Sequence, residues 1–140
     1  MEAVCLNAHP HILLAEDNAD LRELLNFSLV RAGYSVTCCG NGLDLLDRLL
    51  QPQDYDLVIS DLRMPALTGL EVLEYLHDIP HRPPFICMTA FGDAQTHATA
   101  RRLGAAATID KPFDLDEMLD LVQSTCSRIG LKSPSMRSRS

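Results

Sequence analysis

The chain of 140 residues contains no tryptophan, and aromatic residues make up only 5% of it. It has no apolar run near the roughly 20 residues that a membrane-spanning helix needs. Its first residues also lack the basic and then apolar pattern of a secretory signal. We therefore expect no membrane association and a cytoplasmic location.

Cysteine pairs with metal-binding or redox spacing are also missing. The five cysteines are odd in number, and no two have the C-x-x-C spacing. A disulfide framework or a structural zinc site is therefore not expected. Cys87 lies within an apolar run, where we interpret it as a small buried side chain. The neighbours Cys38 and Cys39 receive the same structural interpretation.

The chain also lacks an excess of positive charge. The 19 acidic and 12 basic residues give a formal net charge of −7, and the last acid is Asp120. Binding to nucleic acid depends on clustered Lys and Arg against phosphate, so we expect no direct nucleic-acid contact. An acidic body fits a cation site or a basic partner instead.

The length suits a single domain with a substantial core. Residues 1–10 show no periodicity and are predicted to be a lead-in. Residues 129–140 are rich in Ser and Arg and are predicted to form a flexible basic tail. The domain itself is expected over residues 11–128.

Five short apolar or β-prone runs alternate with five stretches of helical periodicity. The central run, 57–60, ends at Asp61, and continuous apolar runs of this kind are typical of buried parallel strands. Strict alternation predicts an α/β fold with a doubly wound parallel sheet and helices on both faces. The other predicted strands are 12–15, 34–38, 85–88 and 106–109. The predicted helices are 18–32, 43–50, 69–76, 93–103 and 114–126.

Capping residues and leucine spacing set the expected helix ends and faces. Asn18 is a good N-cap, Gly33 is a C-cap signal, and Thr68 with Glu71 forms a capping box. The spacing of apolar residues predicts which side chains face the sheet. In the first two helices these include Leu21, Leu24, Leu25, Ser28 and Ala32, and Leu43, Leu46, Leu49 and Leu50.

Polar residues follow four of the five predicted strands. Glu16 and Asp17 follow the first, Asp61 the third, Thr89 the fourth and Lys111 the fifth. Each of them alone would be an ordinary solvated loop residue. A parallel sheet, however, places the carboxyl ends of all its strands on one edge, where ligands bind. We therefore expect these side chains to meet.

A set of this kind suits phosphoryl transfer. Crowded carboxylates repel one another unless a cation neutralises them, and Mg²⁺ takes carboxylate and phosphate oxygens. A carboxylate can also accept a phosphoryl group, whose negative charge a metal and a lysine would stabilise. The hydroxyl of Thr89 offers a hydrogen bond to a phosphoryl oxygen, and the small Ala90 leaves the approach open.

These motifs resemble the receiver domain of two-component response regulators. The resemblance covers about residues 11–128 and rests on four motifs in order: Ile12–Asn18, Asp61–Pro65 with Gly69, Thr89–Gly92 and Lys111–Phe113. It implies a flavodoxin-like sheet of strand order 2-1-3-4-5.

The resemblance also implies roles for the residues at the strand ends. Asp61 would accept phosphate from a sensor histidine kinase or a histidine phosphotransfer protein, with Thr89 and Lys111 contacting the phosphoryl group. Mg²⁺ would be bound by Asp17, Asp61 and the backbone carbonyl of Arg63, and through water by Glu16. The Lys111–Pro112 peptide bond would be cis. Such a chain is a signalling phospho-acceptor that assists its own phosphorylation and dephosphorylation, and not an enzyme.

One position departs from the family pattern. Many receivers carry Tyr or Phe three residues before the lysine, and this chain has Thr108 there. We therefore expect the phosphorylation signal to pass through the loop after Thr89 and the helix at 93–103. The downstream partner is expected to bind the face formed by 93–103, 106–109 and 114–126. We also expect exchanges of Arg63 and Phe91 to change the dephosphorylation rate.

Other motifs in the chain point to different binding sites or functions. Gly40-Asn41-Gly42 resembles part of a dinucleotide fingerprint but lacks its third glycine, so a turn is favoured. His77 and His81 are separated by the helix-breaking Pro80 and make no metal site. The chain is either a stand-alone receiver or one excised from a larger transcription regulator or hybrid kinase. An interaction module that is never phosphorylated is the alternative from a different class.

Overall fold

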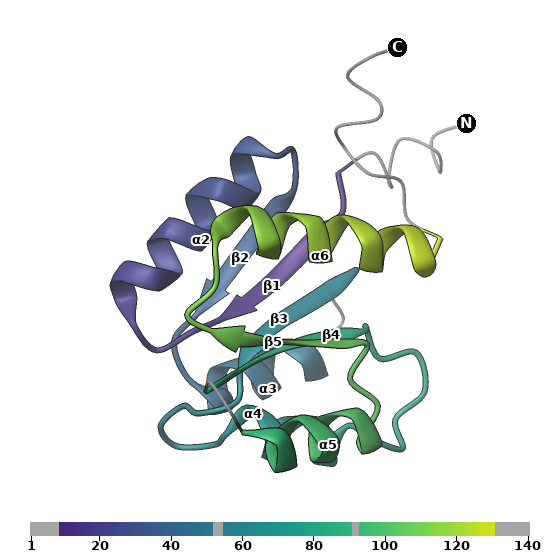
Figure 1. Ribbon diagram of the computed structural model, residues 1–140. Coiled ribbons are helices and arrows are strands. Elements are labelled where there is room, and N and C mark those ends of the chain that lie inside the picture. Colours follow the sequence, from purple (N-terminus) through teal and green to yellow (C-terminus); the bar gives the residue numbers. More distant parts are fainter. Residues whose placement is uncertain (1–8, 52–54, 91–92, 131–140) are drawn as a thin grey trace, which may run out of the picture.

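The computed structural model describes residues 9–51, 55–90 and 93–130, so most of the predicted lead-in and tail lie outside the described residues. Five parallel strands form one sheet of order β2-β1-β3-β4-β5 (Figure 1), as predicted. The elements are β1 (His11–Ala15), α2 (Ala19–Arg31), β2 (Ser35–Cys39), α3 (Gly42–Leu50), β3 (Leu57–Asp61), α4 (Gly69–Tyr75), β4 (Phe85–Ala90), α5 (Ala94–Arg102), β5 (Ala107–Lys111) and α6 (Leu115–Arg128).

Helices cover both faces of the sheet. Figure 1 shows α2 and α6 on one face and α3, α4 and α5 on the other. Because side chains alternate along a strand, β3 sends Leu57 and Ile59 toward α2 and α6, and Val58 toward the opposite helices. All five residues of β3 are buried, which explains its continuous apolar sequence. None of the described helices is both long and apolar enough to cross a membrane.

The predicted helix caps are confirmed, although the last helix, predicted over 114–126, extends to Arg128. The side chain of Asn18 accepts a hydrogen bond from the backbone N–H of Leu21 at 2.9 Å. Thr68 and Glu71 form the reciprocal capping box. Gly33 follows the end of α2 with φ of 105°, a left-handed conformation that favours glycine. These bonds satisfy backbone groups that the first and last helical turns leave unpaired.

The expected faces of the first two helices were partly wrong. Leu24 of α2 is 47% exposed, and Leu43 and Leu50 of α3 are 57% and 53% exposed. Adjacent helical positions differ by about 100°, so both members of a leucine pair cannot face the sheet. Leu25 takes the buried position beside Leu24, and Leu45 is buried in α3.

The fourth and fifth strands each extend two residues beyond their predicted carboxyl ends, and this matters for the site. β4 runs to Ala90 and β5 to Lys111, so Thr89 and Asp110 belong to paired strands and not to the following loops. The register places Thr89 beside Asp110 and Ala90 beside Lys111. The side chains at this edge are therefore held by the sheet itself.

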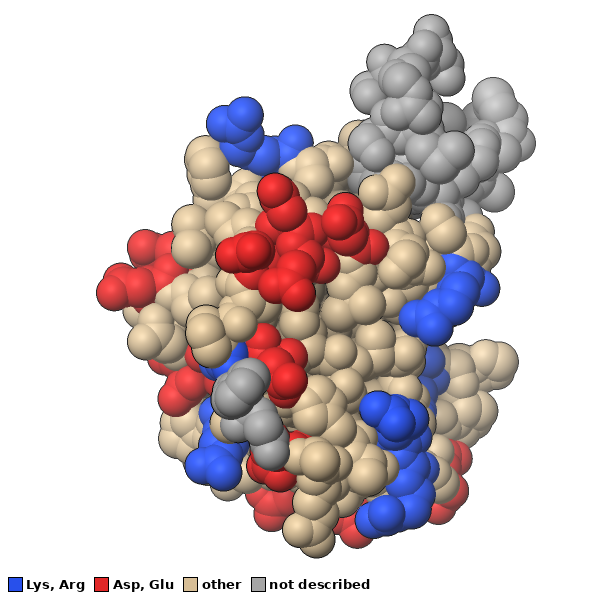
Figure 2. Space-filling model, viewed as in Figure 1, with Lys and Arg blue, Asp and Glu red and all other residues tan. Residues whose placement is uncertain are grey.

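Charge is unevenly distributed over the face shown in Figure 2. Acidic side chains gather over α6, where Asp116, Glu117 and Asp120 are exposed. Basic side chains gather near the end of α5, where Arg101 and Arg102 are exposed. The α5–β5–α6 face thus carries both signs of charge in separate places.

Candidate functional site

Three carboxylates meet at the carboxyl ends of the strands, as the sequence predicts. Glu16 and Asp17 follow β1, and Asp61 is the last residue of β3. One carboxylate oxygen from each lies within 4.8 Å of the others. Glu16 is fully buried, Asp61 is 7% exposed and Asp17 is exposed. The site is therefore a cluster of negative charge that is open to solvent on the side of Asp17.

Lys111 lies between two of these carboxylates. Its Nζ donates to Oε1 of Glu16 at 2.8 Å and to Oδ2 of Asp61 at 2.7 Å. These bonds join the ends of β1, β3 and β5, which are far apart in the chain. The lysine supplies the positive charge that allows buried carboxylates to lie so close together.

Burial and pairing shift the proton affinities in this cluster. Burial raises the pKa of Glu16 by more than the hydrogen bonds from Lys111 and Asn18 lower it. For Lys111, burial acts to lower the pKa, but hydrogen bonds to Asp61 and Glu16 raise it overall. The lysine is therefore held firmly in its charged form, while Glu16 carries its negative charge at a cost that a bound cation would reduce.

The loop after β3 orients Asp61. The backbone N–H of Arg63 donates to Oδ1 of Asp61 at 2.9 Å, and the buried hydroxyl of Ser60 donates to its carbonyl oxygen at 2.9 Å. Gly69, at the start of α4, packs so closely that an added Cβ would lie 2.4 Å from the same carbonyl oxygen. A side chain at position 69 would therefore displace the backbone that carries Asp61.

Thr89 stands at the same edge but turns to another set of partners. Its side chain is 1% exposed, and its hydroxyl donates to Oδ1 of Asp110 at 2.9 Å. The same hydroxyl oxygen lies 2.9 Å from Nε2 of His97 on α5. The structure therefore brings Glu16, Asp17, Asp61 and Lys111 into direct proximity, and it engages Thr89 with a neighbouring network.

His97 and Asp110 are polar partners that the sequence reasoning missed. The ring of His97 contacts the Asp110 carboxylate through Nε2 and the Thr108 hydroxyl through Nδ1, the latter at 2.6 Å. Hydrogen bonds from His97 and Thr89 lower the pKa of Asp110. The available signal was the lone histidine in a helix with few apolar residues, since a buried polar side chain needs partners.

An apolar hollow lies beside Lys111. Ala90 is exposed and borders an apolar hollow of about 500 Å³ that also includes Lys111, Leu21, Pro112 and Phe113. The Lys111–Pro112 peptide bond is cis, as the family resemblance implies. Phe91, named with Arg63 for a role in dephosphorylation, lies outside the described residues.

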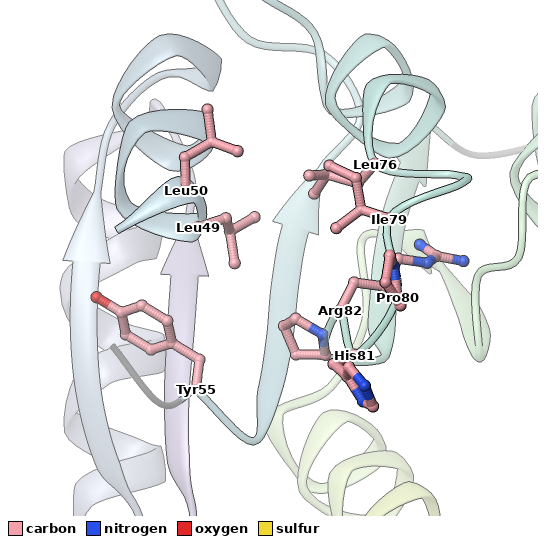
Figure 3. A pocket seen from close by; sticks show the side chains of 9 residues that line it. Leu49, Leu50, Tyr55, Leu76, Ile79, Pro80, His81 and Arg82 are labelled. Carbon is pink, nitrogen blue, oxygen red and sulfur yellow. The ribbon is translucent and has the colours of Figure 1, made fainter. Parts of the chain in front are cut away.

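A second hollow lies at the opposite edge of the sheet. Figure 3 shows this cavity of about 160 Å³ near the amino ends of β3 and β4, lined by leucines and by Tyr55, Ile79 and Pro80. Its lining includes His81 and Arg82 but none of the acidic residues of the site. The carboxyl edge, with its carboxylates and lysine, is therefore the candidate site for chemistry.

The donor set fits a hard divalent cation. Carboxylate oxygens are the ligands that Mg²⁺ prefers, and it commonly keeps several waters. Glu16, Asp17 and Asp61 offer such oxygens at mutual distances of at most 4.8 Å. Asp17 is exposed, so this side of the cluster is open to solvent.

Comparisons with known proteins agree with this geometry. The family model for the response regulator receiver domain matches residues 12–123. Sporulation initiation phosphotransferase F of Bacillus subtilis is 35% identical over 112 residues, which are 80% of this chain and 90% of that protein. The transcriptional regulatory protein FixJ of Bradyrhizobium diazoefficiens is 35% identical over 114 residues, covering 81% of this chain but 55% of FixJ.

Solved structures of receiver domains have a similar fold. The non-phosphorylated receiver domain of HemR from Leptospira biflexa has a TM-score of 0.76 and 35% identity, covering 84% of this chain and 94% of that domain. This chain spans about half the length of some transcriptional regulators that it matches. It belongs to the family of response regulator receiver domains.

Proposed function

We propose that this receiver is a phosphorylation-dependent switch in which Asp61 accepts the phosphoryl group. The donor is a phosphohistidine on a sensor kinase or a phosphotransfer protein in the cytoplasm. The strongest support is the position of Asp61: its carboxylate lies beside Glu16 and Asp17 and pairs with Lys111 at 2.7 Å. A carboxylate so placed has both a cation site and a positive side chain next to its reacting oxygens.

The transfer makes one bond and breaks one. A carboxylate oxygen of Asp61 bonds to phosphorus as the bond from phosphorus to the donor nitrogen breaks, and the electron pair returns to the imidazole. Lys111 and the hydroxyl of Thr89 contact the phosphoryl oxygens. Ala90 leaves room for the donor. Attack by water later releases phosphate, so the chain assists both steps without turning over a separate substrate.

Mg²⁺ is the proposed cofactor. Asp17, Asp61 and the backbone carbonyl of Arg63 would bind it directly, and Glu16 through water. When bound, the ion neutralises the crowded carboxylates and the charge on the phosphoryl oxygens. Lys111 supplies one positive charge for Glu16 and Asp61, so the phosphoryl group would meet a surplus of negative charge without the metal.

The proposed output is a protein contact through the α5–β5–α6 face. This face lies beside Thr89 in the sheet, and it carries separate acidic and basic groups that can select a complementary partner. A receiver can also form part of a longer regulator, as the match to about half of FixJ illustrates.

Intact mass spectrometry tests the proposed chemistry. The protein is incubated with acetyl phosphate, with and without Mg²⁺, and Asp61→Asn serves as the control. We expect a gain of roughly 80 Da that requires Mg²⁺ and is lost in the variant. No gain in the unaltered protein, under conditions where Mg²⁺ binding is confirmed, would favour the interaction module that is never phosphorylated.

A further inference from the structure

The imidazole of His97 joins three polar side chains on the α5 face of the sheet. Nδ1 lies 2.6 Å from the Thr108 hydroxyl and Nε2 lies 2.9 Å from the Thr89 hydroxyl. Nε2 also contacts the carboxylate of Asp110. The His97 side chain is only 19% exposed, so the ring is held between α5 and the neighbouring strands β4 and β5.

Sheet register explains why these residues meet. β4 and β5 pair Thr89 with Asp110 and Cys87 with Thr108. Residues two apart on a strand face the same side, so Thr108 and Asp110 point toward the helix that covers this face. α5 starts after the capping residue Asp93, and His97 lies in its second turn. The ring is thus placed by both the strand pairing and the helix start.

The hydroxyl of Thr89 has only one proton to donate. In the present arrangement that proton goes to Oδ1 of Asp110. Because an ionised carboxylate only accepts, the contact of Nε2 with Asp110 assigns the imidazole proton to Nε2, which also lies against the Thr89 oxygen. Phosphoryl oxygens are acceptors, so a bond from Thr89 to a phosphoryl group needs the same proton. Thr89 can therefore bond to Asp110 or to the phosphoryl group, but not to both.

We propose that His97 is the positioning residue through which phosphorylation at Asp61 changes α5. Together with Asp110 it holds Thr89 toward α5 in the free protein. When Thr89 turns to the phosphoryl group, Nε2 of His97 loses one of its two partners, and the ring adjusts between Asp110 and Thr108. Because His97 belongs to α5, this adjustment alters the α5–β5–α6 face. The inference rests on the proposed function of Asp61.

The ring itself provides the test. Imidazole ¹⁵N signals report which nitrogen carries the proton and what it bonds to, and a purely structural histidine would not change on phosphorylation. We would record them for the ¹⁵N-labelled protein with Mg²⁺ before and after acetyl phosphate, with intact mass measured on the same samples. His97→Gln assigns the signals. His77, which is bonded to the adjacent Asp78 on the surface, is the matched control.

We expect the His97 signals to move upon phosphorylation while those of His77 stay in place, and we expect neither to move in Asp61→Asn. A sample with the full mass gain and unchanged His97 signals would overturn the role of His97 and leave the proposed function intact. A lack of mass gain in the unaltered protein would overturn the proposed function, and this inference with it.

Discussion

The carboxyl edge of the sheet has two halves that differ in what holds them. In the first half, Glu16, Asp61 and Lys111 are held by ion pairs between β1, β3 and β5. In the second, Thr89 and Asp110 are held by hydrogen bonds with His97 of α5. In the proposed reaction the Lys111–Glu16 pair can persist, while Lys111 transfers its other contact from the Asp61 carboxylate to the added phosphoryl oxygens. The single hydroxyl proton of Thr89 must be exchanged between partners.

We therefore assign different roles to the two halves in the proposed function. The acidic half already brings three carboxylates and a lysine together, as the proposed chemistry at Asp61 requires. In the proposed switch, the hydroxyl half would alternate between the arrangement in this structure and one in which Thr89 bonds to the phosphoryl group. Substitutions in one half test whether the other half responds.

The largest expected effect comes from Gly69→Ala, which acts on the acidic half. The new Cβ would lie 2.4 Å from the carbonyl oxygen of Asp61 and 3.0 Å from the Ser60 hydroxyl. Because that backbone has little room to move, we expect the unfolding free energy to fall by about 3 kcal/mol.

Gly40→Ala is the matched control for urea unfolding. Its Cβ would meet Nη1 of Arg22 at 3.1 Å, the far end of a side chain that can give way by a few tenths of an ångström and still donate to the Glu16 carbonyl oxygen. We expect a change within about 0.5 kcal/mol. Equal stability of the two variants would show that the loop carrying Asp61 is less constrained than its packing indicates.

Lys111→Met should have the next largest effect. It keeps the volume of the side chain but leaves the buried Glu16 and Asp61 without their shared positive charge. We expect a loss of about 2 kcal/mol without Mg²⁺, reduced from the value for fully buried pairs because the lysine is partly exposed. Mg²⁺ should restore more stability to the variant than it adds to the unaltered protein.

Arg101→Met serves as the control for charge removal, since Arg101 is exposed and lies outside the site. The thermal stability of the unaltered protein, Lys111→Met and Arg101→Met is measured with and without Mg²⁺. A smaller Mg²⁺ effect in Lys111→Met than in the unaltered protein would argue against a cation site at these carboxylates.

Thr89→Val acts on the hydroxyl half and should be milder. The substitution keeps the shape but removes the hydroxyl that bonds to Asp110 and His97, while those two residues still bond to each other. We expect a loss of about 1 kcal/mol in urea unfolding. Thr99→Val in α5 is the control for exchanging a threonine hydroxyl for a methyl group outside this network. A similar loss in both variants would remove the special role given to the Thr89 network.

The smallest effect concerns alkaline pH. Pairing raises the pKa of Lys111 above its ordinary value of 10.5, so the folded state holds this proton more tightly than the unfolded state. The stabilisation is therefore complete below pH 10.5 and is lost as the pH rises through the folded-state pKa. The stability difference between the unaltered protein and Lys111→Met should shrink from pH 9 to about pH 11.5. A constant difference would contradict the raised pKa.

The acidic half was predictable from the sequence, because its residues directly follow predicted strands and parallel strands end at the same edge of the sheet. Acids and a lysine directly after apolar runs must meet if the strands are parallel, and Glu16, Asp61 and Lys111 do. Caps such as Asn18 and Thr68 were equally readable, since their bonds are local. The roles of these residues in metal binding and phosphoryl transfer remain predictions.

The hydroxyl half was not predictable in the same way. His97 reaches Thr89 only because of the rotation of α5 against β4 and β5, which depends on packing far along the chain. The predicted strand ends at residue 109, whereas β5 extends through Lys111 and places Asp110 beside Thr89. The same dependence on rotation misled the assignment of Leu24, Leu43 and Leu50 to the core.

The coupling of the two halves through Thr89 is the central claim, and a double-mutant cycle tests it most directly. The ratio of phosphorylated to free protein is measured by intact mass at a limiting concentration of acetyl phosphate. His97→Ala should raise this ratio about fivefold, the factor that corresponds to one net hydrogen bond of about 1 kcal/mol lost from the free state. In a Thr89→Ala background the same substitution should change the ratio by less than about 1.5-fold, because the bond it releases is already absent. A fivefold rise in both backgrounds would show that His97 does not act through Thr89 and would contradict the account.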